Sequence, residues 1–227
     1  TVVNINLSGN SYNHIANSPF TVTLNAGQCY QVQSINIDTD LSGSTITAND
    51  NKKIAVFAGN ICNRVPHEEE GRDHMMEQMI PTPHWGNEFI ITNSLLRTSD
   101  RVRVTALNND CEIIKDGISL TTINARETYE FEITSSSPVT YLETSEPSSV
   151  FLYSTGAWYG GMDGDPSMVI VNPLNQRINK AKFSTYYIDG SQNHFINIVT
   201  NTNNVTTGYG TWVDYWNKNL GGGALYE

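Results

Sequence analysis

Residues 54–89 read IAVFAGNICNRVPHEEEGRDHMMEQMIPTPHWGNEF. The apolar run at 54–58 has the composition of a β-strand, and the run MMEQMI at 75–80 alternates in the manner of a second strand. A polar, acidic loop separates the two. In an alternating strand His74 and Met75 point to opposite faces, and we expect His74 to be hydrogen-bonded within a β core, because buried polar groups need partners. The stretch therefore predicts two strands joined by a long loop.

Short alternating segments recur on both sides of this stretch, with Gly, Asn, Asp and Pro between them. The Asp116-Gly117 pair predicts a tight hairpin turn, because these residues readily take positive φ angles. No amphipathic helix of convincing length is present, so the predicted fold class is all-β. The predicted strands lie at 2–7, 20–24, 29–35, 44–48, 54–58, 75–80, 88–92, 101–107, 111–115, 118–123, 128–133, 139–143 and 150–154.

The chain also repeats itself. The segment NAGQCYQV begins at Asn25 and the similar NARETYEF begins at Asn124, 99 residues later. This predicts a tandem repeat of about 95 residues, the size of one β-sandwich-like module. The expected division is 1–98 for the first repeat, 99–192 for the second, and 193–227 for a partial third repeat or closing strands, either as separate units or as one continuous domain. A β-propeller is the alternative architecture.

The charge balance argues against two classes of partner. The chain has 13 basic and 23 acidic residues and a formal charge of −10, which repels phosphate backbones and anionic lipid surfaces. No apolar run reaches the roughly 18 residues of a membrane-spanning helix, and the start of the chain lacks a signal-peptide pattern. Only 16% of residues are charged, and amide and hydroxyl side chains are abundant, as in secreted β proteins. We expect a secreted, extracellular protein, its signal peptide removed, with no nucleic-acid binding and no membrane insertion.

Glycosylation and disulfide bonding are two modifications that the sequence suggests. Asn-X-Ser/Thr triplets begin at Asn6 and Asn204 and predict N-glycosylation. The cysteines Cys29, Cys62 and Cys111 have no metal-type CxxC spacing, and at most one internal disulfide can form among three. We expect Cys29 to pair with Cys111, because both lie in predicted strands, whereas Cys62 stands at the entrance of a loop.

Four motifs stand out by their order and spacing. They are SGSTITANDNKKIAVFAGN at 42–60, DHMMEQMIP at 73–81, HWGNEF at 84–89 and GDPSMVIVNP at 164–173. Together they resemble the N-terminal domain family of the IgG Fc-binding protein. The resemblance implies an extracellular all-β module of adhesive or mucus-type proteins, without an assigned enzymatic activity. Members of that family carry a cysteine just before the DH pair, where Arg72 stands here, so Cys62 lacks the partner that the resemblance implies.

Two acidic loops contain candidate metal ligands. His67 and Glu69 lie in the loop HEEEGRD, and Asp163 and Asp165 flank Gly164 in the loop YGGMDGDPSM. Carboxylate oxygens on a flexible turn suit calcium, and His with carboxylates suits other divalent ions. The alternative for the first loop is a solvated loop tip, and for the second it is an ordinary Asp-Gly turn. We expect no cofactor other than a possible calcium ion. If the two loops converge, they can share a site.

Aromatic rings are the second class of candidate. Trp158 and Tyr159 lie in a Gly-rich segment, and Trp212 and Trp216 lie in an Asn-rich segment near the end of the chain. Such rings can stack on sugars or anchor a protein partner, and otherwise they pack in a core. The sequence contains no GxSxG, HExxH or phosphate-loop motif, so it marks no catalytic residue.

These observations favour a non-catalytic recognition or structural module that binds glycan or glycoprotein partners in mucus, matrix or adhesive material. Carbohydrate binding through the aromatic rings suits that role. A metal-dependent hydrolase that uses the acidic loops is one alternative. A self-associating building block of a secreted gel or filament is the other.

Overall fold

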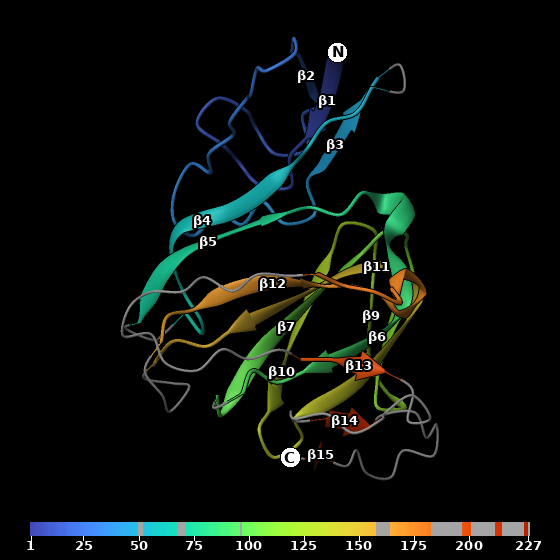
Figure 1. Cartoon of the computed structure of the whole chain (residues 1–227). Helices are drawn as coiled ribbons and strands as arrows, with labels where there is room; N and C mark the ends of the chain where they lie inside the picture. The colour runs from blue at the N-terminus through green and yellow to red at the C-terminus, as the bar shows by residue number, and fades with distance from the viewer. Residues whose placement is uncertain are drawn as a thin grey trace.

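The computed structural model describes residues 1–49, 52–67, 71–95, 97–157, 164–182, 197–200, 212–214 and 225–226. Strands dominate its regular structure, and two single-turn 3-10 helices, η1 (Thr82–His84) and η2 (Leu174–Gln176), lie between them. Figure 1 shows an N-terminal lobe on one side of a larger sheet. The prediction of an all-β fold is confirmed. No helix in the described residues has the length and apolar character that crossing a membrane requires.

Residues 1–49 form the N-terminal lobe, which is built around a three-stranded antiparallel sheet. Its strands lie in the order β2 (Phe20–Thr23), β1 (Val2–Asn6), β3 (Thr45–Ala48). Alternation along β1 turns Val3 and Ile5 inward, where they are 3% and 5% exposed. Val22, Val32 and Ile54 pack against them. The lobe therefore has a small apolar core of its own.

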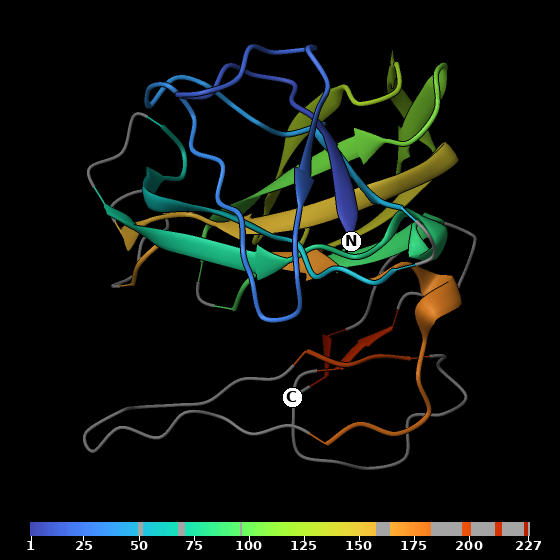
Figure 2. The same ribbon diagram turned by 90° about the horizontal axis from the view of Figure 1, so that it is seen from above.

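The large sheet contains seven strands and is organised around β11. Its strands are β6 (Gly86–Thr92), β7 (Ser99–Ala106), β8 (Cys111–Lys115), β9 (Ile118–Ile123), β10 (Thr128–Thr134), β11 (Val139–Ser154) and β12 (Ser167–Val171). The first part of β11 pairs with β6 and β8, and its last part pairs with β7 and β12. Because β11 exchanges partners along its length, the sheet curls around it. β11 is the long gold strand in Figure 2.

The core of the large sheet comes from the inward faces of alternating strands. Val102 and Val104 on β7 and Leu142 on β11 have no exposed surface. Phe89 and Ile113 pack with them in the same cluster. Burying each of these side chains contributes about 1.5–3 kcal/mol, so this cluster is the main source of stability for the sheet.

The hairpin of β4 (Phe57–Arg64) and β5 (Arg72–Gln78) has the strand–loop–strand order expected from the central stretch, but its strands are shifted from the predicted 54–58 and 75–80 and occupy much of the predicted loop. Met75 is 4% exposed and Met76 is 69% exposed, so the side chains alternate as predicted. The expectation for His74 is wrong, because its side chain is 77% exposed and pairs with Asp73 at 2.9 Å. The apolar Met75 occupies the inward position because burial favours it over an imidazole.

The predicted Asp116-Gly117 hairpin turn is confirmed. It joins β8 to β9, and its two residues have φ angles of 51° and 79°. A last small sheet has the order β13 (Val199–Thr200), β14 (Trp212–Asp214), β15 (Leu225–Tyr226). Val199 packs with Ile90 of the large sheet, so this segment contacts the rest of the fold.

The repeated motif forms the same turn twice. At 25–28 and at 124–127 the first amide donates to the side chain of the fourth residue, and the fourth amide donates to the first carbonyl. The third residue has positive φ in both turns, 79° at Gly27 and 72° at Arg126. The surrounding sheets differ, however, because one has three strands and the other seven, and the larger one includes β6 from before residue 98. Among the described residues we see neither equal β-sandwich modules nor equal propeller blades, and the domain division stays a prediction.

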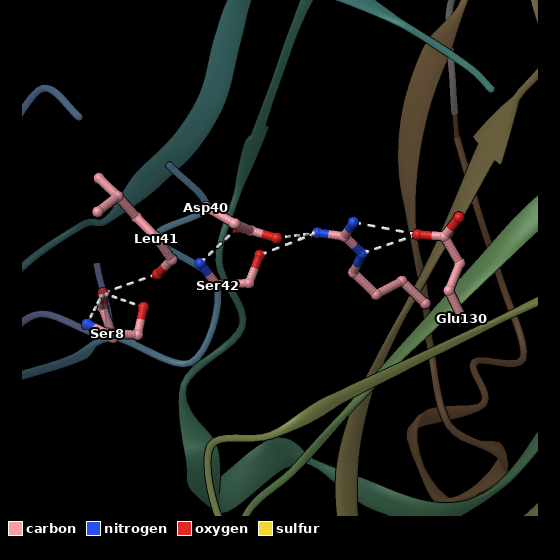
Figure 3. A network of polar contacts seen from close by, with 7 residues as sticks. Ser8, Asp40, Leu41, Ser42 and Glu130 are labelled. Carbon is pink, nitrogen blue, oxygen red and sulfur yellow. Dashed lines mark hydrogen bonds and ion pairs between the residues drawn. The ribbon is translucent and has the colours of Figure 1, made fainter. Parts of the chain in front are cut away.

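Two arginines attach the N-terminal lobe to the large sheet. Arg103 on β7 donates from Nη1 to Asp40 Oδ2 at 2.7 Å and from Nη2 to Glu130 Oε2 at 3.0 Å. Figure 3 shows Asp40 and Ser42 on the lobe side of this contact and Glu130 of β10 on the other side. Arg126 donates from Nε to the Gly43 carbonyl at 2.8 Å. The loop at 40–43 is therefore held by two guanidinium groups from the large sheet.

The Asp40 carboxyl is tuned by this contact. Burial disfavours its charged form, but hydrogen bonds from Ser42 and the charge of Arg103 outweigh burial, so the pKa of Asp40 lies below its ordinary value. The ring of Tyr153 lies 5.7 Å from the Arg103 guanidinium carbon, within cation–π range. The ionised pair is the form that the fold favours.

Candidate ligand-binding hollow in the N-terminal lobe

A hollow of about 160 Å³ opens on the N-terminal lobe. Two chain segments line it, residues 11–14 and residues 30–33. Pockets for drug-sized ligands measure about 300–1,000 Å³, so this hollow has room for one ring or a short chain. We call it the Tyr30 hollow.

Backbone hydrogen bonds hold the two segments together. The amide of Tyr12 donates to the Gln33 carbonyl at 3.2 Å, and Ser11 forms an isolated antiparallel bridge with Ser34. Ser11 also closes a turn, because its amide donates to the His14 carbonyl at 2.8 Å and its hydroxyl accepts from the His14 amide at 3.0 Å. The hollow is therefore formed before any ligand arrives, which lowers the entropic cost of binding.

Three aromatic rings cluster at the hollow. The His14 imidazole stacks on Phe20, with the ring centroids 3.4 Å apart and the planes within 2°. Its Nε2 lies 2.9 Å from Tyr30 Oη, and Tyr30 packs edge-on against Phe20. Tyr30 stays 41% exposed despite these contacts, and Tyr12 is 65% exposed. A fixed but accessible tyrosine gives contact area at little conformational cost.

The loop that carries His14 is tied to the large sheet. Asn17 has a φ of 55° and its amide donates to the Leu7 carbonyl at 2.8 Å. Its side-chain oxygen accepts from Arg126 Nη1 at 3.2 Å. The same arginine therefore holds the 40–43 loop and the loop next to the hollow.

The chemistry of the lining is that of amides, hydroxyls and rings. Asn13, Gln31 and Gln33 each present both donors and acceptors. The described residues that line the hollow include no lysine, arginine, aspartate or glutamate. Tyrosine, serine and asparagine together are the side chains with which antibody loops recognise ligands. The arrangement can bind a polar, uncharged surface.

The aromatic residues predicted from sequence lie elsewhere or outside the described residues. Trp158, Tyr159 and Trp216 fall outside the described ranges. Trp212 begins β14, for which only the backbone is described. Their role in recognition stays a prediction.

The two acidic loops meet at their bases. The amide of Gly156 donates to the Val65 carbonyl at 2.8 Å, and a Cβ at Gly156 would lie 3.2 Å from the Gly71 carbonyl oxygen. His67 and Asp165 are exposed, while Glu69 and Asp163 fall outside the described residues. Where the structure describes the chain, no three His, Cys, Asp or Glu side chains gather as a metal site would require. Calcium binding stays a prediction.

The predicted modification sites are placed differently from one another. Asn6 lies on β1 with its carboxamide oxygen buried and without a partner among the described residues, while Asn204 lies outside them. The predicted Cys29–Cys111 disulfide is not formed in the structure. Cys29 and Cys62 are exposed and unpaired, whereas Cys111 is buried with its Sγ 3.5 Å from Ser148 Oγ. Cys111 is held in the core of the large sheet, while Cys29 lies on the lobe surface.

Sequence reasoning missed the residues of the Tyr30 hollow. The segments SGNSYNH at 8–14 and CYQVQS at 29–34 combine tyrosine with serine and amides. Residues 1–49 also contain no lysine, arginine or glutamate. These two signals, binding-loop composition and missing charge, could have pointed to the lobe before its geometry was known.

Comparison with known proteins gives one positive finding. The family model described as IgGFc binding protein matches residues 1–223. Neither the curated proteins nor the solved structures include a match. The match covers the N-terminal lobe and the large sheet together, in agreement with the resemblance carried by the four sequence motifs.

Proposed function

The chain belongs to the IgG Fc-binding protein family, and on that basis we propose that it is a secreted, extracellular binding module for a glycan or glycoprotein partner. The family description names a protein ligand, the Fc part of IgG. For this chain the proposal is limited to the broader class of partner. The Tyr30 hollow is the proposed binding site.

The single observation behind this assignment is the combination of fixed rings and free amides at the hollow. Tyr30 is held by His14 and Phe20 yet remains 41% exposed. Sugars present an apolar face that can stack on such a ring and hydroxyls that pair with amide groups. Asn13, Gln31 and Gln33 supply those amides. This supports carbohydrate binding within an adhesion or mucus setting.

The test is binding of the purified full chain to a glycan array and to mucus glycoproteins. Tyr30→Ala and Tyr12→Ala should each weaken binding at least about fivefold, because exposed tyrosines that anchor an interface cost more than about 1 kcal/mol when truncated. Tyr30→Phe should have a smaller effect, since it keeps the ring.

Tyr141→Phe is a matched control, because it also removes a hydrogen-bonded hydroxyl, one that donates to Glu88 on the large sheet at 2.7 Å. It should leave binding unchanged. Absence of binding to any glycan or glycoprotein, or equal loss in Tyr30→Ala and the control, would refute the proposed function.

A second candidate function is self-association through the β4–β5 hairpin. Phe57, Ile61 and Met76 on this hairpin are 59%, 87% and 69% exposed. Within the described residues β4 pairs only with β5, so its other edge offers unpaired backbone groups. Exposed apolar side chains on a strand edge favour pairing with another chain. This supports a building block of a secreted gel or filament.

Sedimentation velocity over a range of concentrations tests that candidate. Ile61→Lys should abolish any concentration-dependent association, because it places a charge on the edge. Ile118→Lys, on the exposed strand β9 of the large sheet, is the control for added charge. A wild-type chain that stays monomeric at high concentration would exclude this role.

A further inference from the structure

The Tyr30 hollow lies in a part of the chain that is almost free of charge. Residues 1–49 contain two ionisable acids, Asp38 and Asp40, and no lysine, arginine or glutamate. Asp40 is bound to Arg103, whose other partner is Glu130, so this cation is compensated by two carboxylates. The described residues of the lining include no lysine or arginine, and the Nε2 of their one histidine, His14, already lies 2.9 Å from Tyr30 Oη.

Anionic ligands are therefore at a disadvantage at this site. A carboxylate or sulfate that enters a hollow loses part of its hydration, and only a cation or several aimed amides restore the lost free energy. The net charge of −10 on the whole chain adds a repulsive field. Uncharged sugars avoid the charge repulsion and have a smaller desolvation cost, because the hydrogen bonds that their hydroxyls lose to water can be replaced by those of amides.

The volume of the hollow limits how much of a ligand it can take. About 160 Å³ is well below the size of pockets for drug-sized molecules. One sugar ring is of suitable size, and the rest of a glycan would extend over the exposed Tyr12.

Resting on the proposed function, we infer that the Tyr30 hollow binds the uncharged terminal sugar of a glycan, a hexose or an N-acetylhexosamine, and discriminates against glycans that end in sialic acid or carry sulfate. Tyr30 stacks on the ring, and the amides of Gln31 and Asn13 pair with its hydroxyl or acetamido groups. The preference for uncharged over anionic glycans comes from the lack of a lysine or arginine among the described residues of the lining as much as from the contacts with the sugar.

The test uses the full chain and one glycoprotein with sialic-acid-terminated N-glycans, before and after sialidase treatment. Binding is measured by biolayer interferometry at pH 8. The expected result is at least about tenfold tighter binding to the desialylated form. Equal or tighter binding to the sialylated form would overturn this inference and leave the proposed function standing. Binding to neither form, nor to any other glycan, would overturn both.

A charge introduced at the hollow should change the selection. Gln31 is exposed and lines the hollow, so Gln31→Lys should fold and should improve binding to the sialylated form relative to the desialylated form by about tenfold. Gln31→Met controls for loss of the amide. Thr122→Lys, at an exposed position of β9, controls for the change in net charge. If Thr122→Lys shifts the ratio as much as Gln31→Lys, the hollow does not set the selectivity and the inference fails.

Discussion

At the scale of single residues, two aspartates respond to burial in opposite ways. Asp40 is held ionised by Ser42 and Arg103, and its pKa is lowered. Asp100 on β7 has no exposed surface, and burial raises its pKa, because the hydrogen bonds from Ser94 and Thr155 and the charge of Arg97 only partly compensate. Its Oδ1 has no hydrogen-bond partner among the described residues. Ionisation of Asp100 therefore lowers the free energy of unfolding.

The pH dependence of stability follows from the sign of that shift. A carboxyl whose pKa is higher in the folded state holds its proton more tightly there, so its stabilising contribution is complete below the ordinary value of about 3.9 and is lost as the pH rises through the folded value. Asp100→Asn should remove this loss, which amounts to about 1.4 kcal/mol for each unit of pKa increase.

Urea unfolding of wild type and Asp100→Asn at pH 4, 5.5 and 7 measures the effect. The variant should show the smaller decline in the free energy of unfolding between the first and last pH. Asp38→Asn, at an exposed position, should keep the slope of the wild type. A slope that is the same in all three proteins would show that Asp100 titrates as an ordinary carboxyl.

At the scale of elements, the turn shared by 25–28 and 124–127 demands a left-handed residue at its third position. Gly27 has a φ of 79° and a Cβ there would meet no atom within 4 Å, so only backbone strain opposes a side chain. Gly27→Ala should lower the free energy of unfolding by about 1–2 kcal/mol. Gly27→Asn should cost less, because asparagine tolerates this conformation. Denaturant titration of the two variants checks the order, and equal stability of both with wild type would contradict it.

The elements also show which predictions from sequence succeed. Strands with strict alternation, such as β1, β7 and β10, are found within one or two residues of their predicted bounds. The segments at 139–143 and 150–154, predicted as separate strands, are one strand, β11. Pro147 and the polar residues around it suggest a break, but pairing with strands on both edges keeps the chain extended, and a register irregularity between Glu143 and Ser148 absorbs the misfit.

The candidate site was less accessible to prediction than the fold. The segment at 29–35 alternates and is predicted as a strand, yet it forms only the single bridge from Ser34 to Ser11. That failure to join a ladder leaves Tyr30 and Gln31 at the surface, where they line the hollow. Alternation in the sequence predicts which face of a strand is apolar, but it does not predict with which other strand the segment pairs. Pairing depends on contacts between segments that are distant in sequence.

At the scale of the whole molecule, the docking of the lobe depends on Arg103 and Arg126. Their contacts are partly solvent-exposed, so each should contribute only about 1 kcal/mol. The double variant Arg103→Met/Arg126→Met should therefore loosen the lobe without unfolding the large sheet. Hydrogen exchange should become faster in the segment at 39–44 and stay slow in β7 and β11, whose centres are buried.

Lys180→Met, at an exposed position, is the control for charge removal at a site away from this contact. It should leave exchange unchanged throughout. Equal protection of 39–44 in the double variant and in wild type would show that the apolar contacts of the lobe are sufficient to dock it. A loss of protection in β7 as well would show that lobe and sheet unfold as one unit.

The placement of β11 also has a consequence for how the chain is made. β6, β7 and β8 are all synthesised before β11, the strand with which all three of them pair. At about 5–20 residues per second, roughly 3–12 s pass between the translation of Thr92 at the end of β6 and that of Ser154 at the end of β11. During this time the apolar faces of the earlier strands are without their final neighbour, and chaperones or wrong pairings have access to them. The nascent chain thus completes its large sheet late, in a step timed by translation.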